Sequence, residues 1–256
     1  MTDEERFDEI LEELRALLLD LGDLSSKVML IGGQVLALES RLRGGTGVIA
    51  VATNTGTLVE RGYSYEPDLL FDLDGTEFMA ERLPEVLRLR GYSRTRTFRW
   101  SKDLPGGRMD LDLFAPGDVD AEALPTQMTG LPEARFALRK CRPVALSVGK
   151  SSLRILLPDA AGFLSMKERA TSLRRPPNPK DCFDIYAYVS MVGLDQVKMS
   201  LGDAGEDGRA LRERLRALFD APSSRGVLDV LASAASLEDA EKRLLAQGVV
   251  DLFAEL

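Results

Sequence analysis

The sequence of 256 residues contains no histidine, and this absence excludes several kinds of enzyme site. Without an imidazole the chain cannot form a Ser-His-Asp or Cys-His hydrolase site, a histidine-bound zinc site or a histidine general base. Any catalysis must therefore use carboxylates, Lys, Arg, Tyr or Ser, together with a metal ion where the reaction needs one.

Cysteine is also scarce, since Cys141 and Cys182 are the only two. Each stands beside charged residues, and their separation does not match the spacing of metal ligands. We therefore expect two free thiols in a reducing, cytoplasmic environment.

Long apolar runs are missing as well. No run approaches the roughly 18 residues that a bilayer-spanning helix needs. The start of the chain, Met1-Thr2-Asp3-Glu4-Glu5, is too acidic and polar for a secretory signal, so we expect no membrane partner. The net charge of −8 argues against a protein that coats nucleic acid non-specifically, although it leaves room for a local basic groove.

The residues that are present predict an α/β (α+β) fold in two parts. Apolar content of 45% and charged content of 29% are typical of a globular protein that buries a full core. Helical spacing of apolar residues in the first half predicts helices over 3–21, 34–41 and 76–90. Short apolar or alternating stretches predict strands over 28–31, 48–52, 69–71, 95–100, 109–114, 144–148 and 153–157.

After Pro158 the pattern becomes helical. Helices are predicted over 159–173, 180–192, 207–219, 224–234 and 237–246. Gly202–Gly208 is predicted to be a flexible loop between two of them. We therefore expect a mixed sheet flanked by helices in residues 1–157, followed by a helical domain in residues 158–256.

Carboxylates occur in pairs on two predicted strands. Residues two apart on a strand project from the same face, so Glu66 should point with Asp68, and Asp110 with Asp112. If the strands are neighbours, three carboxylates converge, and such an oxygen-only set suits Mg²⁺, with Mn²⁺ as a substitute. The sequence leaves open whether Asp110 or Asp112 is the third ligand.

Two simpler interpretations of these acidic residues stay open. Carboxylates at strand ends are often only solvated. Asp72-Leu73-Asp74 offers a competing pair nearby, although it is more typical of a strand exit followed by a helix N-cap. Pro67 lies between the two preferred residues and predicts a strand that is irregular or at a sheet edge.

Two further segments carry groups that suit phosphate. Gly32 and Gly33 lie between a predicted strand and a predicted helix, where backbone N–H groups can approach a phosphate. The other segment spans two helices and contains Lys167, Arg174, Lys180, Asp181 and Asp184. Lys and Arg can hold a polyphosphate, and a carboxylate on the second helix can orient them. A charged helical hairpin with weak surface pairs would give the same pattern.

Together these segments resemble the AbiEii-like nucleotidyltransferases. This branch of the polymerase-β-type superfamily includes toxins of toxin–antitoxin and phage-defence systems. The resemblance covers about residues 28–192, and its most specific part is the helical motif. The matching segments are Leu30–Gln34, Ser64–Leu70, Leu111–Pro116, and the helical residues Lys167, Ala170, Arg174, Lys180, Asp181 and Asp184. Glu66 stands where the family carries its first metal-binding Asp, and Gly33 stands where the family often carries Ser.

The resemblance implies a Mg²⁺-dependent enzyme that moves an NMP from an NTP to a tRNA 3′ end or a protein hydroxyl. A role as a toxin with a cognate antitoxin is implied in the same way. The implied metal ligands are Glu66, Asp68 and Asp112, of which Asp112 would help to deprotonate the acceptor. The alternatives are a catalytically degenerate protein of the same fold that binds a nucleotide or a partner as a regulator, and a purely structural interaction module.

A basic strip near the middle of the chain suggests an RNA surface. It consists of Arg88, Arg90, Arg94, Arg96, Arg99 and Lys102. Trp100 lies within it and offers a ring for base stacking. An ordinary solvated face would give the same charge pattern.

Overall fold

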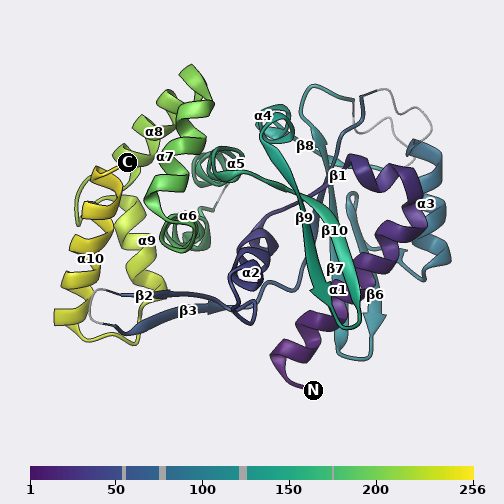
Figure 1. Ribbon diagram of the computed structural model, residues 1–256, viewed down its shortest axis with the longest axis horizontal. Coiled ribbons are helices and arrows are strands. Elements are labelled where there is room, and N and C mark those ends of the chain that lie inside the picture. The colour runs from purple at the N-terminus through teal and green to yellow at the C-terminus, as the bar shows by residue number, and fades with distance from the viewer. Residues whose placement is uncertain (54–55, 75–78, 121–125, 175) are drawn as a thin grey trace. The chain divides into compact units, whose positions relative to one another are not determined.

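The computed structural model describes residues 1–53, 56–74, 79–120, 126–174 and 176–256. The chain packs as two compact units. Unit 1 comprises Met1–Gly47 and Tyr63–Pro158, and unit 2 comprises Val48–Gly62 and Asp159–Leu256. The fold is mixed α/β with a C-terminal helical region, as predicted (Figure 1).

Unit 1 is built on one mixed sheet. Its strands are β1 (Val28–Ile31), β4 (Asp68–Phe71), β5 (Ser93–Arg94), β6 (Arg99–Leu104), β7 (Gly107–Pro116), β8 (Thr129–Leu131), β9 (Cys141–Val148) and β10 (Ser151–Pro158). The strand order is β5-β6-β7-β4-β1-β10-β9, and β8 pairs with β7 beside this path. β1 pairs in parallel with β10 and antiparallel with β4, while β4 pairs in parallel with β7. Every residue of β1 is buried, as expected for a central strand.

The helices of unit 1 are α1 (Asp3–Leu21), α2 (Gly33–Leu42), α3 (Met79–Leu89) and α4 (Ala134–Arg139), with a 3₁₀ segment over Gly22–Lys27. A capping box between Thr2 and Glu5 starts α1, and its apolar side packs on α3, β9 and β10. The predicted helix over 3–21 is therefore confirmed. The predicted helix over 76–90 corresponds to α3, and its first residues lie outside the described part of the chain.

Two expectations about the strands of unit 1 are wrong. Residues 95–98 form a turn, closed by hydrogen bonds from Thr95 N and Arg96 N to Arg99 O, so the strand begins only at Arg99. The strand after Pro67 lies inside the sheet, between β1 and β7. Pro67 is tolerated because it stands just before β4, where its carbonyl still accepts a hydrogen bond of 3.0 Å from Asp112 N.

Unit 2 consists of six described helices and a hairpin from much earlier in the chain. The helices are α5 (Ala160–Leu173), α6 (Pro179–Val192), α7 (Leu194–Asp203), α8 (Gly205–Leu218), α9 (Arg225–Ser233) and α10 (Asp239–Ala254), and the hairpin strands are β2 (Ile49–Ala52) and β3 (Leu58–Gly62). β2 packs on α6 and β3 on α9. Thr57 Oγ1 lies 3.0 Å from Glu241 Oε1 and donates a hydrogen bond to it. The predicted division at residue 157 did not include this hairpin in the helical part.

The loop predicted over Gly202–Gly208 is wrong. α7 runs to Asp203 and α8 starts at Gly205, so only Ala204 separates them. Gly208 lies within α8, and a Cβ built there would stand 1.9 Å from Leu201 O. This glycine serves the close packing of two helices, which a sequence pattern cannot distinguish from flexibility.

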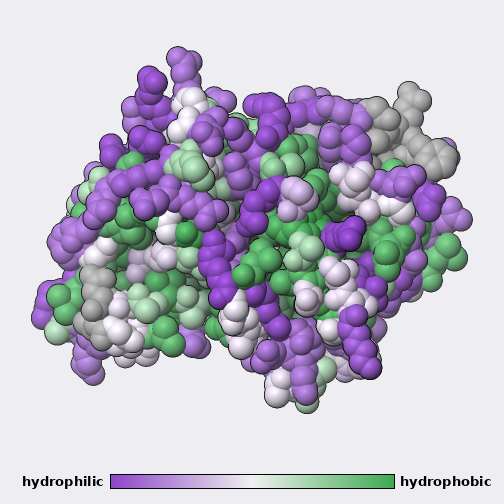
Figure 2. Space-filling view, viewed as in Figure 1, coloured by the Kyte–Doolittle hydropathy of each residue, from purple (hydrophilic) through white to green (hydrophobic). Residues whose placement is uncertain are grey.

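The surface of unit 2 matches the amphipathic pattern of its helices. In α8, Leu211 and Leu215 are buried, whereas Glu206, Arg209 and Glu213 are exposed. The end of unit 2 that carries α7 and α8 is largely hydrophilic in Figure 2. Among the described residues no helix has the length and apolar character to cross a membrane. The two cysteines are free thiols, as predicted.

Candidate functional site

Register places two of the predicted carboxylates side by side. Asp68 begins β4 and is the direct partner of Asp112 on β7 in a parallel pair. Side chains at such partner positions lie on the same face of neighbouring strands, about 4.8 Å apart. Asp112 is buried, and Asp68 is half-buried. The two acidic strands are therefore neighbours, which was the condition for their carboxylates to converge.

Gly32 makes room for one of these carboxylates. It follows β1 as the N-cap of α2 with a φ of 74°, and a Cβ built on it would stand 2.0 Å from Asp68 Oδ2. The carboxylate of Asp68 therefore lies against the start of α2, where the positive end of the helix dipole favours an anion. Gly33 is buried as the first residue of the helix. The glycine pair thus positions Asp68, and phosphate binding by Gly32 and Gly33 stays a prediction.

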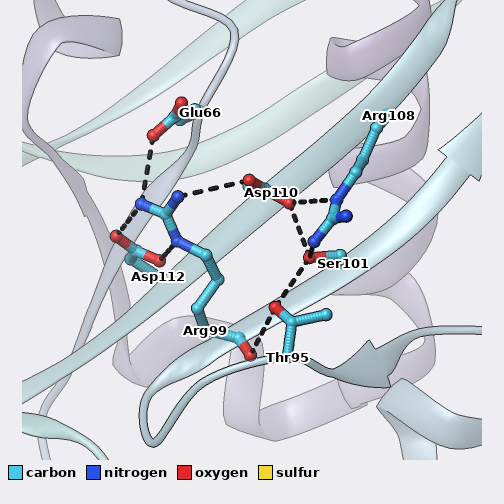
Figure 3. A network of polar contacts seen from close by, with 7 residues as sticks. All are labelled: Glu66, Thr95, Arg99, Ser101, Arg108, Asp110 and Asp112. Carbon is cyan, nitrogen blue, oxygen red and sulfur yellow. Dashed lines mark hydrogen bonds and ion pairs between the residues drawn. The ribbon is translucent and has the colours of Figure 1, made fainter.

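Arg99 stands at the centre of three carboxylates (Figure 3). Its guanidinium donates to both oxygens of Asp112, with Nε–Oδ1 at 2.6 Å and Nη2–Oδ2 at 2.7 Å. Nη1 lies 3.2 Å from Asp110 Oδ2, and Nη2 lies 3.1 Å from Glu66 Oε2. We call Glu66, Asp110 and Asp112 around Arg99 the carboxylate cluster. The four groups come from β6, β7 and the segment before β4.

A second layer of contacts orients Asp110. Ser101 Oγ donates to Asp110 Oδ1 at 2.5 Å, and Arg108 Nε donates to the same oxygen at 2.8 Å (Figure 3). Burial alone would raise the pKa of Asp110, but these two hydrogen bonds and the charges of Arg108 and Arg99 lower it below its ordinary value of 3.8. Asp110 is therefore an anion at neutral pH.

The carboxylate cluster fits a divalent cation in its chemistry. Its donors are oxygens only, which is the set that Mg²⁺ prefers, and the Arg99 guanidinium shows that the cluster binds positive charge. Across the described residues no three Asp, Glu, Cys or His side chains stand ready to hold a metal ion as they lie. In the structure the cationic position among these carboxylates is taken by Arg99.

The competing acidic pair, Asp72 and Asp74, binds other cations than the carboxylate cluster does. Asp72 Oδ2 is 3.7 Å from Lys27 Nζ, and Asp74 Oδ2 is 2.5 Å from Arg135 Nη1. Both aspartates therefore make surface ion pairs of the ordinary kind.

In unit 2, the helical motif forms a largely buried charge network. Lys167 on α5 lies 2.6 Å from Asp184 Oδ2 and 3.3 Å from Asp181 Oδ1, both on α6. Arg174 Nη1 is 3.1 Å from Asp181 Oδ2. Asn178 and Pro179 start α6 and set Asp181 and Asp184 one turn apart on its inner face. The predicted orientation of Lys167 and Arg174 by carboxylates is therefore present, while the side chain of Lys180 is exposed.

Arg61 completes this network from the β2–β3 hairpin, and the sequence analysis missed it. Its Nε lies 3.3 Å from Asp184 Oδ1. Its Nη1 is buried and has no hydrogen-bond partner within the described part of the chain. We call Lys167, Asp181, Asp184, Arg174 and Arg61 the lysine cluster. No sequence motif marks Arg61, because only the folding of the hairpin onto α6 and α9 brings it there.

The basic strip is divided in the structure. Trp100 is only 3% exposed, so the expected stacking of its ring on a base is wrong. Arg90 and Lys102 both bind Glu13 at 2.8 Å, and Arg99 belongs to the carboxylate cluster. The other three cations are exposed, and RNA binding by them stays a prediction: Arg88, Arg94 and Arg96.

Scans against protein-family models, curated proteins and solved structures find no match to the chain.

Proposed function

We propose that the chain is a Mg²⁺-dependent nucleotidyltransferase that moves an NMP from an NTP to a hydroxyl of a tRNA 3′ end or of a protein. The observation that carries this proposal is the in-register pair Asp68 and Asp112, set beside the Gly32 turn and joined by Glu66 through Arg99. Action as a toxin with a cognate antitoxin rests on the family resemblance alone.

The proposed reaction breaks a phosphoanhydride bond of the NTP and forms a phosphodiester bond to the acceptor. The acceptor oxygen bonds to the α-phosphorus of the NTP, and the bond from that phosphorus to the oxygen bridging to the β-phosphorus breaks. Pyrophosphate leaves with the bridging oxygen, and the acceptor proton passes to a carboxylate, for which Asp112 is the candidate. Glu66, Asp68 and Asp112 would hold Mg²⁺ or Mn²⁺, which offsets the charge of the phosphates.

Within unit 2, the lysine cluster offers cations that suit phosphate. Two buried aspartates face three cations, so the cluster carries an excess of positive charge. A phosphate oxygen would also provide the acceptor that Arg61 Nη1 does not find among the described residues. Lys180, exposed at the start of α6, would add a further charge.

A catalytically degenerate regulator is the second candidate. The observation that favours it is Arg99, which occupies the centre of the carboxylates. Glu66 also favours this candidate, because its side chain is longer than that of the Asp that the family carries at this position. Such a protein would bind a nucleotide or a partner without transferring NMP.

Transfer of label tests the proposal. Each α-labelled NTP is incubated with Mg²⁺ and the protein, alone or with total tRNA. We expect label from at least one NTP to reach tRNA or protein, and Asp68→Asn to lower the rate about 100-fold or more. Asp72→Asn, which removes only a surface pair, is the matched control and should retain the rate. No transfer with Mg²⁺ or Mn²⁺ would leave the regulator as the better account.

A further inference from the structure

Arg99 uses the same oxygens that the proposed function assigns to a metal ion. Both carboxylate oxygens of Asp112 accept from it, and its Nη2 also lies 3.1 Å from Glu66. We infer that Arg99 is a built-in counter-ion: it holds the carboxylate cluster together without metal and must leave before Glu66 and Asp112 bind a divalent cation. This inference rests on the proposed function and concerns how the metal site is controlled.

The charges require a cation at this place. Glu66, Asp110 and Asp112 come within reach of one guanidinium, and like charges so close together repel one another strongly. Without a cation the three side chains would spread apart. Arg99 therefore keeps them gathered during the time in which no metal is bound.

Arg99 and a divalent cation exclude each other. A cation bound to Asp112 would stand within a few ångströms of the guanidinium, in a setting where Asp112 is buried and screening is weak. Arg99 therefore has two positions in this account. In one it binds the carboxylates, and in the other it points away from them.

The position of Arg99 in the fold allows this movement. It is the first residue of β6 and follows the turn over 95–98, and its side chain is 20% exposed. The backbone need not move, because rotation about the side-chain bonds alone carries a guanidinium several ångströms. Arg108 differs, since it binds Asp110 and Ser101, neither of which is a proposed metal ligand, and its side chain is 53% exposed.

Metal binding without nucleotide tests the inference. The full chain is titrated with Mn²⁺, and binding is followed by the relaxation of water protons, which does not depend on enzymatic activity. Arg99→Met should bind Mn²⁺ about tenfold more tightly than the wild type, because the competing cation is gone. Arg108→Met removes a neighbouring charge from the same sheet and should change the affinity by less than about threefold.

A second variant covers the case in which Arg99→Met does not fold. Arg99→Lys keeps the charge but cannot bind Asp112 with two parallel hydrogen bonds, so it should bind Mn²⁺ about threefold more tightly than the wild type. Equal or weaker Mn²⁺ binding by the folded Arg99 variants would overturn the inference.

The outcome also separates the inference from the proposed function. If the wild type transfers label but the Arg99 variants bind Mn²⁺ with the same affinity as the wild type, the proposed function stands and the counter-ion role is wrong. If neither wild type nor variants bind Mn²⁺, and no label is transferred, both proposals are wrong.

Discussion

Single atoms at Gly32 and Asp68 set the geometry of the Asp68–Asp112 pair. A hydrogen at Gly32 leaves space for Asp68 Oδ2, and the φ of 74° turns the chain from β1 into α2. The sequence identified both residues, because a glycine pair after an apolar strand and an acidic residue before one are local patterns. The sequence predicted Arg99 only as part of a basic strip. Its contact with Asp112 depends on the pairing of β6 with β7, which no local pattern predicts.

Gly32→Ala tests this geometry. The methyl group would meet Asp68 at 2.0 Å and the left-handed backbone would be strained, so we expect loss of transfer together with a lower melting temperature. Gly91→Ala is the matched control, because Gly91 has a φ of 83° and nothing within 4 Å of its Cβ position. It should lose about 1–2 kcal/mol from strain and keep its activity. Equal activity of the two variants would show that Asp68 does not need the space at Gly32.

Elements of unit 1 are tied together by a buried acid on α1. Glu13 accepts from Arg90, just after α3, and from Lys102 on β6. Burial alone would raise the pKa of Glu13, but Arg90 and Lys102 outweigh it and lower the pKa below the ordinary 4.5. Local sequence patterns predicted elements at α1, α3 and β6. The contact between them forms only in the tertiary fold, so the sequence could not predict it.

Acid denaturation should report this contact. The pKa of Glu13 is lower in the folded state, so the unfolded chain binds more protons at acid pH. The contribution of Glu13 is therefore complete above about pH 4.5 and is lost as the pH falls through the folded pKa. Glu13→Gln should lose about 1–3 kcal/mol of unfolding free energy near neutral pH and show a shallower loss on acidification. Glu12→Gln, at a half-exposed pair with Arg15, should follow the wild-type curve.

The lysine cluster ties α5, α6 and the β2–β3 hairpin in a similar way. Asp184→Asn would leave Arg61 without its ion-pair partner and would weaken the position of Lys167. We expect a loss of about 3 kcal/mol in chemical denaturation. Lys180→Gln, at an exposed position on the same helix, should stay within about 0.5 kcal/mol of wild type. A small effect of Asp184→Asn would mean that the cluster contributes nothing to folding.

Helical spacing predicted most helices of unit 2, because that signal lies within a few residues. Asn178 followed by Pro179 starts α6, and Asp159 starts α5 by accepting from Gly162 N at 2.9 Å. No local pattern in residues 48–62 identifies the helices on which the hairpin packs. Its place against α6 and α9 joins segments more than a hundred residues apart, which local patterns do not encode.

At the scale of the whole molecule, the chain passes from one unit to the other three times. Unit 2 is therefore incomplete without residues 48–62. A fragment of residues 159–256 should unfold at a lower temperature than the same fragment fused through a flexible linker to residues 48–62, because β2 and β3 cover α6 and α9. Thermal unfolding followed by circular dichroism measures the difference. Equal melting temperatures would show that the helices form a unit by themselves.

The central claim is that the chain transfers an NMP with the carboxylates of unit 1 and binds phosphate with the cations of unit 2. Side-by-side transfer assays of one variant from each unit test it most directly. Asp68→Asn alters unit 1, and Arg174→Met alters unit 2 at a side chain that is 52% exposed, so its folding should be little affected. With the α-labelled NTP that the wild type uses, we predict losses of about 100-fold for Asp68→Asn and at least about tenfold for Arg174→Met. Wild-type rates in either folded variant would contradict the account.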